Sequence, residues 1–257
     1  MTNPMSLEGH NIIVTGAAQG IGEATARHCI ELGAHVTLVD VQAERLEALV
    51  RELGPERAAA HAGSVADPEF VQNMVDQVLQ SRKAIHGLVN NAGIVRAAMI
   101  AKMSTAQWQQ VIDVNLTGVF HCLQAVGRHM IERAKSGDTS PAAIVNISSD
   151  AGRRGTIGQI NYGAAKSGVL GITMSAAREW AGNGIRVNSV CYGVVETEMT
   201  ETIRSEKFHD TIMAQVPMRR FATPAEASQP VCFLLSQAAS YITGQHLSVN
   251  GGYTIGV

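Results

Sequence analysis

A tyrosine and a lysine in the second half of the chain have a spacing that could support proton transfer. Tyr162 and Lys166 are four positions apart, so on a helix they share one face, one turn apart. The pKa of a free phenol is about 10, and a neighbouring ammonium lowers it, which would make the tyrosine usable as a general acid or base. The plainer interpretation is a half-buried ring beside a solvated charge.

Composition narrows the class of protein. The 257 residues are 46% apolar and 16% charged, with 25 glycines, which is typical of a globular chain with tight turns. A net charge of −2 gives no reason to expect a nucleic acid or an anionic membrane as partner. No apolar run approaches the roughly 20 residues of a membrane span, and residues 1–10 lack a signal-peptide pattern. We therefore expect a cytoplasmic protein.

The four cysteines are scattered along the chain. Cys29, Cys122, Cys191 and Cys232 show no CxxC spacing and no nearby histidine pattern. We expect them to be small buried hydrophobes in a reducing compartment, with neither a disulfide nor a metal site.

Apolar runs typical of strands alternate with segments of helical periodicity. The expected strands are 11–15, 35–40, 57–61, 85–90, 142–148, 185–191 and 246–250. The expected helices are 20–32, 43–53, one that begins at Pro68 after an Asp67 cap, 105–133, 160–181 and 224–236, while 197–220 is mixed. This alternation predicts an α/β fold, with one parallel sheet of about seven strands covered by helices on both faces, and a single domain over 1–257.

Ligands of such sheets bind beyond the carboxyl ends of the strands, and a glycine-rich turn follows the first strand. The run TGAAQGIG at 15–22 includes Gly16, Gly20 and Gly22. Glycines let backbone amides approach a pyrophosphate, and the helix N-terminus that follows favours its negative charge. The spacing is GxxxGxG rather than GxGxxG. A turn that only needs positive φ is the alternative.

Asp40 ends the second strand, 18 positions after Gly22. A carboxylate there can accept hydrogen bonds from the adenosine ribose and would repel a 2′-phosphate. Neither Gln19 nor Val41 offers a positive charge. These features favour NAD(H), with NADP(H) as the lesser choice. Asp40 could also cap the next helix.

Polar residues follow the later strands. Asn91, Ala92 and Gly93 form a turn that could be structural, cofactor-adjacent, or both. Asn115 lies in an apolar helical run, where it either satisfies a broken helix backbone or contacts Lys166 through a water. Ser148 and Ser149 end the fifth strand, where a hydroxyl could donate to a substrate carbonyl or serve as a cap.

In this order and at these distances, the motifs resemble the short-chain dehydrogenase/reductase family, from about Leu7 to the C-terminus. The motifs are TGAAQGIG (15–22), Asp40, NNAG (90–93), Asn115, Ser149, YGAAK (162–166), Gly193…Thr197 and NGG (250–252). The resemblance implies a Rossmann-type, doubly wound sheet. It also implies a catalytic set of Asn115, Ser149, Tyr162 and Lys166, with Ser149 chosen because the family places the serine thirteen positions before the tyrosine.

The same resemblance implies the residues that bind the cofactor. They are Gly16, Gln19, Gly20, Ile21, Gly22, Asp40, Val65, Asn91, Ala92, Gly93, Tyr162, Lys166, Gly193, Val195 and Thr197. Thr197 would bind the nicotinamide carboxamide, and Val195 would reach it through its backbone. Lys166 would bind the nicotinamide ribose and lower the pKa of Tyr162. Asn115 would hold a water that relays the proton.

Two positions depart from the family pattern. Tyr192 replaces the usual proline after the sixth strand, where its ring either narrows the substrate pocket or packs under it. Ser64 replaces the usual Asp or Asn before Val65, so adenine contacts would rest on the Val65 backbone.

The expected reaction is hydride transfer between NAD(H) and a small secondary alcohol or its ketone. The motifs look nearest to the 3-oxoacyl-(acyl-carrier-protein) reductase branch, so an NADPH-dependent reductase of 3-oxoacyl-carrier-protein or 3-oxoacyl-CoA is the alternative. Asp40 argues against it, as do Ser140 and Asn183, which replace the arginines that bind the carrier protein. Arg153 and Arg154 could supply that charge or be solvated. A catalytically silent NAD-sensing subunit is a further class.

Substrate choice should depend on 150–159, 94–99 and 199–218. Residues 194–220, rich in Met and other apolar side chains, could form a mobile lid or an ordinary amphipathic helix pair. His209 has no assigned role. The resemblance also implies a homotetramer formed through 105–133, 160–181 and the C-terminal segment 251–257.

Overall fold

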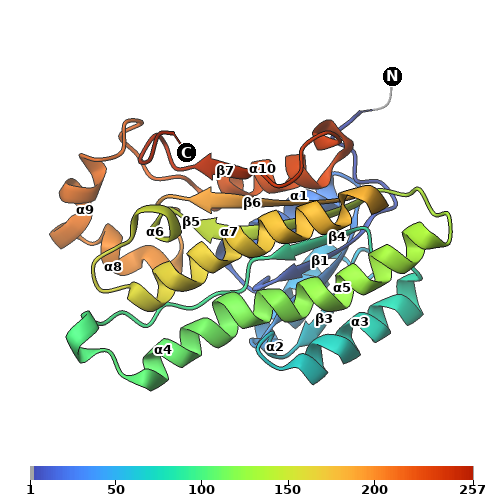
Figure 1. The fold of residues 1–257 in the computed structure, drawn as a ribbon, viewed down its shortest axis with the longest axis horizontal. Helices are drawn as coiled ribbons and strands as arrows, with labels where there is room; N and C mark the ends of the chain where they lie inside the picture. Colours follow the sequence, from blue (N-terminus) through green and yellow to red (C-terminus); the bar gives the residue numbers. More distant parts are fainter. Residues whose placement is uncertain (1–2, 257) are drawn as a thin grey trace.

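Seven strands form one parallel sheet in the order β3-β2-β1-β4-β5-β6-β7 (Figure 1). The computed structural model describes residues 3–256, so Met1, Thr2 and Val257 of the expected domain and C-terminal segment lie outside the described residues. The strands are β1 (Asn11–Thr15), β2 (His35–Asp40), β3 (Ala58–Ala62), β4 (Gly87–Asn90), β5 (Ala142–Ser149), β6 (Ile185–Tyr192) and β7 (His246–Val249). The fold class predicted from the alternation is therefore confirmed.

Helices cover both faces of the sheet (Figure 1). One face carries α1 (Gly20–Glu31), α2 (Ala43–Leu53) and α10 (Pro224–Leu235), and the other carries α3 (Pro68–Arg82), α5 (Gly118–Lys135) and α7 (Ile160–Trp180). Successive strand side chains point to opposite faces, so Ile12 and Val14 of β1 join the first core while Ile13 joins the second. This double burial explains why the strands are almost continuously apolar.

The strand order reverses beside β1, which pairs with β2 on one side and β4 on the other. The connections that leave β1 and β4 therefore run to opposite sides of the sheet and open a crevice at the carboxyl ends of these strands. The glycine-rich turn follows β1 and residues 91–93 follow β4, while Asp40, Ser149 and Gly193 lie at the carboxyl ends of β2, β5 and β6, so the parallel topology gathers them at one edge.

Most expected boundaries hold within two residues. Asp67 caps α3 as predicted, because its Oδ1 accepts hydrogen bonds from the backbone amides of Glu69 (2.9 Å) and Phe70 (3.3 Å). The expected helix 105–133 differs: it consists of α4 (Thr105–Ile112), a π-helical turn (Asp113–Thr117) and α5.

Short helices make up the remaining connections. They are α6 (Ala151–Arg154), α8 (Glu201–Arg204), α9 (Glu206–Met213) and the 3-10 turns Ile100–Lys102, Ala181–Asn183, Glu198–Thr200 and Gln237–Ala239. Within residues 3–256, no helix combines the length and apolar character needed to cross a membrane. The homotetramer stays a prediction, because a single chain is described.

The packing of α5 on α7 yields a test of the fold. A Cβ at Gly127 of α5 would lie 2.5 Å from Cη2 of the buried Trp180, so Gly127→Ala must displace the indole. We expect a loss of about 1–3 kcal/mol in the free energy of unfolding, measured by urea denaturation. The matched control is Gly182→Ala, because a Cβ there meets no atom within 4 Å. Equal stability of the two variants would contradict the packing described.

Candidate active site

A groove of about 810 Å³ opens at the carboxyl ends of β1, β4, β5 and β6. Its walls contain nearly all of the predicted site residues, from the glycine-rich turn and Asp40 to Ser149, Tyr162, Lys166 and Thr197. Two predicted residues, Gly22 and Asn115, do not line it. Residues as far apart in the chain as Gly16 and Pro224 are therefore brought to one cavity.

The glycine-rich turn is shaped by close backbone contacts. Gly16 has φ +65°, and a Cβ there would lie 2.8 Å from the Cα of Ala92. Gly22 is buried beneath the turn, where a Cβ would overlap the carbonyl of Gly16. Gly22 does not line the groove and instead lets α1 pack against the turn, so its contact with a cofactor stays a prediction.

The N-terminus of α1 offers free donors to the groove. Its N-cap residue, Gln19, makes no side-chain capping hydrogen bond. The first-turn amides of a helix have no carbonyl partner within the helix, and the helix dipole adds partial positive charge there. Gly20 and Ile21 lie in this turn and line the groove, so this end of the groove fits an anionic pyrophosphate.

The turn after β4 is fastened to the end of β1. The side-chain amide of Asn91 donates to the carbonyls of Thr15 and Gly16, both at 3.0 Å. The Thr15 hydroxyl accepts from the backbone amides of Asn91 (3.0 Å) and Ala92 (3.1 Å). Asn91 is thus structural through its side chain, while Asn91, Ala92 and Gly93 still line the groove.

Asp40 joins two segments and also faces the groove. Its carboxylate accepts hydrogen bonds from the backbone amides of Ala18 (3.2 Å) and Gln42 (3.1 Å). The N-cap of α2 is Gln42, so Asp40 supports the entry to that helix without being its cap. Each carboxylate oxygen has a further lone pair that can accept a ribose hydroxyl.

Arg45 lines the groove although no motif in the sequence predicts it there. Its guanidinium contacts the side chain of Gln19 and lies 3.2 Å from Glu198 Oε1. Arg45 therefore brings a positive charge to the Asp40 end of the groove, from the first turn of α2 rather than from positions 19 or 41. Its place in the amphipathic pattern of α2 gave no signal for this role.

The expected acid–base residues meet where β5 ends and α7 begins. Ser149 is the last residue of β5, and Tyr162 and Lys166 lie in the first two turns of α7. Lys166 is only 3% exposed, and its Nζ donates to the carbonyl of Ile147 at 2.8 Å. The same nitrogen lies 5.7 Å from the centroid of the Tyr162 ring. The two side chains share a face, as their spacing predicts.

Burial controls the protonation of both groups. It lowers the pKa of Lys166 to about 8. Burial also raises the pKa of Tyr162, although the neighbouring Ser149 hydroxyl acts in the opposite direction. Burial is the larger effect on Tyr162, and the Lys166 ammonium donates to the Ile147 carbonyl, so the expectation that Lys166 lowers the pKa of Tyr162 stays a prediction.

Asn115 lies in the π-helical turn and is fully buried. Its Oδ1 accepts from the backbone amide of Ile94 (2.8 Å), and its Nδ2 donates to the carbonyl of Ile94 (2.9 Å). Neither predicted alternative describes this contact. The side chain holds the loop that follows Gly93, so it shapes the groove from behind without lining it.

The Tyr192 ring packs beneath the groove. Its hydroxyl donates to the carbonyl of Ala227 in α10, and its side chain belongs to the buried core. Of the two predicted alternatives, packing under the pocket is therefore the one observed. Tyr192 thus links the floor of the groove to α10.

The backbone that follows Tyr192 is closely held. Gly193 leaves room for Asn250, which would lie 2.9 Å from an added Cβ. Val195 pairs with Ala222, and Thr197 faces Gly20 across the groove. The Val65 carbonyl accepts a hydrogen bond from His121 (3.2 Å).

The arginines of α6 do not face the mouth of the groove. Arg153 donates to the Ser248 hydroxyl (2.6 Å) and to the His246 carbonyl (3.0 Å), so it is neither free nor simply solvated. Arg154 stacks on Tyr253, 3.6 Å from the ring centroid. Ser140 and Asn183 precede β5 and β6, at the opposite edge of the sheet from the groove. The absence of arginine at these two positions therefore does not change the charge around the groove of the same chain.

Burial of Lys166 makes the stability depend on pH. Its pKa of about 8 in the folded chain lies below the ordinary lysine value of 10.5, so the unfolded chain binds more protons between these values and stability rises with pH. Lys166→Met removes this contribution. The free energy of unfolding of the variant minus that of the parent should therefore fall by about 2 kcal/mol from pH 7 to pH 9.5, measured by urea denaturation. Lys207→Met, which removes an exposed lysine, is the control, and a constant difference for Lys166→Met would disprove the shift.

The chain was compared with known proteins. The family model described as enoyl-(acyl carrier protein) reductase matches residues 16–254. A 3-oxoacyl-(acyl-carrier-protein) reductase of Thermotoga maritima is 41% identical over 253 residues, which cover 98% of this chain and 100% of the relative.

Solved structures give the same result. A Brucella melitensis short-chain dehydrogenase/reductase, named a glucose/ribitol dehydrogenase, superposes with a TM-score of 0.89 at 33% identity, covering 97% of this chain and 98% of that one. A Beutenbergia cavernae protein, provisionally named an NAD(P)-dependent gluconate 5-dehydrogenase and holding NADP at low occupancy, has a TM-score of 0.91 at 34% identity, covering 98% and 99%. Matches of this extent identify the present chain as an oxidoreductase that belongs to the short-chain dehydrogenase/reductase family.

Proposed function

We propose that the chain reduces the keto group of a 3-oxoacyl thioester, with oxidation of the 3-hydroxy compound as the reverse reaction. The observation that carries the reaction type is the meeting of Ser149, Tyr162 and Lys166 in one groove. The substrate class is supported by the reductase relative that matches over its full length. The preference for a small alcohol or ketone, stated from Asp40, is less well supported than this alternative.

A nicotinamide dinucleotide fits the groove by its chemistry. The uncapped amides of α1 suit the pyrophosphate, and Asp40 suits the adenosine ribose. Lys166 has three N–H donors, of which Ile147 uses one, so two can bind the nicotinamide ribose. Val195 and Thr197 would hold the carboxamide end. When bound, the nicotinamide supplies or accepts the hydride.

The side chains of the groove would carry out the proton transfer. In reduction, the Tyr162 hydroxyl donates its proton to the substrate oxygen while the Ser149 hydroxyl hydrogen-bonds to that oxygen. The raised pKa of Tyr162 keeps the phenol protonated at neutral pH, which suits a proton donor. In alcohol oxidation the phenol must first lose its proton, and a charged Lys166 beside it would favour this.

The loops at the mouth favour an apolar substrate. The Ala98 amide donates to the Gly158 carbonyl at 2.9 Å, so the predicted substrate segments 94–99 and 150–159 do meet. Met99, Ile157 and Met199 expose 58%, 88% and 49% of their surface on these segments and on the 3-10 turn after Val195. An acyl chain could cover such a rim.

We also propose that 194–220 acts as a lid. Helices α8 and α9 contain no buried residue, and they project from one end of the sheet (Figure 1). Val216 and Phe221 are buried and anchor the end of the segment. The exposed helices argue against the alternative of an amphipathic pair packed on the core.

A second substrate class, small polyols or their ketones, is favoured by two observations. The solved relatives are named for sugar-derived substrates. Arg153 and Arg154 are occupied by the C-terminal strand and turn, so they leave little positive charge for an acidic carrier protein. A panel of acetoacetyl thioesters, secondary alcohols, polyols and ketones separates the classes by initial rate. Turnover only with polyols would contradict the thioester proposal.

The role of Tyr162 is tested by Tyr162→Phe. We expect kcat/KM to fall at least ~100-fold, because the proton donor is lost, while NADH affinity changes less than ~3-fold. Initial rates and NADH fluorescence titration measure the two quantities. Tyr241→Phe is the control, since Tyr241 is fully exposed. Near-parental turnover of Tyr162→Phe would refute the assignment, and a parent that binds NADH without any turnover would indicate the silent NAD-sensing class.

Cofactor choice is tested at Asp40. A carboxylate at the ribose end repels a 2′-phosphate, so we expect NADH to be preferred over NADPH in kcat/KM. Asp40→Asn should shift this ratio toward NADPH by about tenfold. Glu47→Gln, which removes an exposed charge from α2, should leave the ratio unchanged. A parent that prefers NADPH would show that Arg45, rather than Asp40, dominates this end of the groove.

A further inference from the structure

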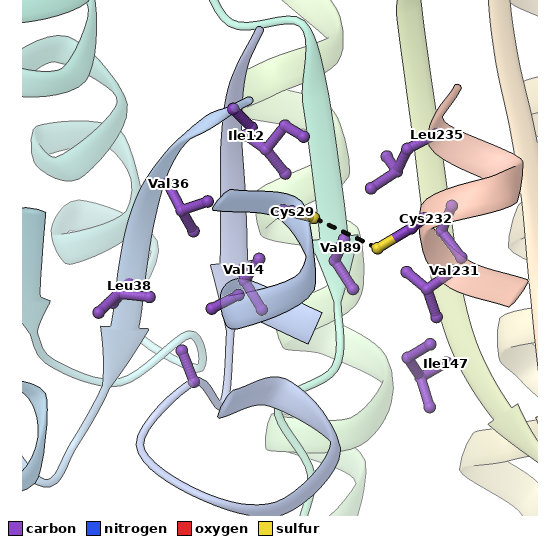
Figure 2. Close-up of a cluster of buried hydrophobic side chains, with 14 of the residues drawn as sticks. Ile12, Val14, Cys29, Val36, Leu38, Val89, Ile147, Val231, Cys232 and Leu235 are labelled. Carbon is purple, nitrogen blue, oxygen red and sulfur yellow. Dashed lines mark hydrogen bonds between the residues drawn. The ribbon is translucent and has the colours of Figure 1, made fainter. Parts of the chain in front are cut away.

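Two thiols from distant parts of the chain face each other between α1 and α10 (Figure 2). The Sγ atoms of Cys29 and Cys232 are 3.7 Å apart, although the residues are separated by 203 positions. Both side chains are buried. Spacing in the sequence carries no sign of this pair, because the contact arises only when the two helices pack on the same face of the sheet.

The surroundings of the pair are apolar and closely packed. Val89, Val231 and Leu235 lie around the two sulfurs in the same core (Figure 2). A disulfide needs an S–S distance of about 2.05 Å, so closing the gap requires a movement of about 1.7 Å shared by two side chains. In residues 3–256 no other sulfur–sulfur contact is recorded, and Cys122 and Cys191 are buried singly.

The two thiols are not equivalent. The hydrogen bond from Cys29 lowers the pKa of Cys232, and His28 adds to this effect, whereas the pKa of Cys29 is raised. His28 is partly exposed, and its Nδ1 lies 3.2 Å from the hydroxyl of Ser228, one turn before Cys232. Cys232, the thiol with the lowered pKa, therefore lies next to a partly exposed side chain, and its larger thiolate fraction makes it the expected nucleophile.

We propose that Cys29 and Cys232 are a disulfide-forming modification site whose oxidant is a small hydroperoxide. The Cys232 thiolate attacks the peroxide O–O bond, which gives a sulfenic acid and releases hydroxide, which takes up a proton to give water. The Cys29 sulfur then attacks the Cys232 sulfur. The sulfenic hydroxyl leaves and takes up the Cys29 thiol proton to form the second water. In sum, two thiols and one H₂O₂ give one disulfide and two waters, and a dithiol reverses the reaction.

The cross-link stabilises the fold without closing the groove. It joins α1 to α10, and constraining a loop of this length removes much conformational freedom from the unfolded chain. Of the groove-lining residues of these helices, Gly20, Ile21 and Pro224 lie at the opposite ends from the cysteines, whereas Glu23 and Arg27 of α1 lie closer to Cys29. This inference does not depend on the proposed substrate.

Oxidation of the folded parent chain tests the proposal. After treatment with hydrogen peroxide, the intact mass should fall by ~2 Da, and a non-reduced peptide map should join the peptides that contain Cys29 and Cys232. Dithiothreitol should restore the original mass. A gain of ~16 Da without cross-linking, no reaction, or a disulfide between other cysteines would each overturn the proposal.

Variants and stability complete the test. Cys29→Ala and Cys232→Ala should abolish the mass loss, whereas Cys122→Ala should react as the parent does. If Cys29→Ala and Cys232→Ala do not fold, the peptide map of the oxidised parent still shows whether the Cys29–Cys232 disulfide forms. The cross-linked parent should show a Tm at least ~5 °C above the reduced form, with NADH affinity changed less than ~2-fold. An equal or lower Tm of the verified cross-linked form would refute the stabilising role.

Discussion

The close approach of two backbone turns, after β1 and after β4, is the constraint on which the rest of the groove depends. Gly16 and Gly22 leave no room for a Cβ, and Asn91 and Thr15 hold the turns together. This contact sets the position of the first turn of α1, whose free amides give this end of the groove a character suited to an anion. A bulkier residue at either glycine would move the helix away from the sheet and the donors away from the groove.

A second constraint is the buried ammonium of Lys166. Removing a charge from water is costly unless it is hydrogen-bonded, and a single carbonyl, that of Ile147, contacts it. The low pKa of Lys166 reports this incomplete compensation. Active sites commonly contain buried ionisable side chains with shifted pKa values. A ligand that brings hydroxyls can complete the hydrogen bonds of such a side chain. The neighbouring phenol is then influenced by a charge whose strength depends on what fills the groove.

The two ends of the groove differ in how far they specify a ligand. The Tyr162 end contains a set of groups with defined chemistry, and it carries the reaction type. At the other end, Asp40 and Arg45 place opposite charges at the same part of the groove. The exposed apolar side chains at the rim suit apolar substrates with several lengths of chain.

The sequence by itself determined the alternation of strands and helices, the cap at Asp67 and the shared helix face of Tyr162 and Lys166, because these follow from local periodicity, local hydrogen bonding and spacing along one helix. The wider set of groove residues was implied by the resemblance of the motifs to a known family. Only the tertiary structure decided that Gly22 packs beneath the turn, that Asn115 holds Ile94, that Arg45 joins the site and that Cys29 meets Cys232. Each of these contacts joins segments brought together by packing on the sheet. No local pattern encodes which distant side chain will lie opposite, because that depends on how complete helices and strands fit together.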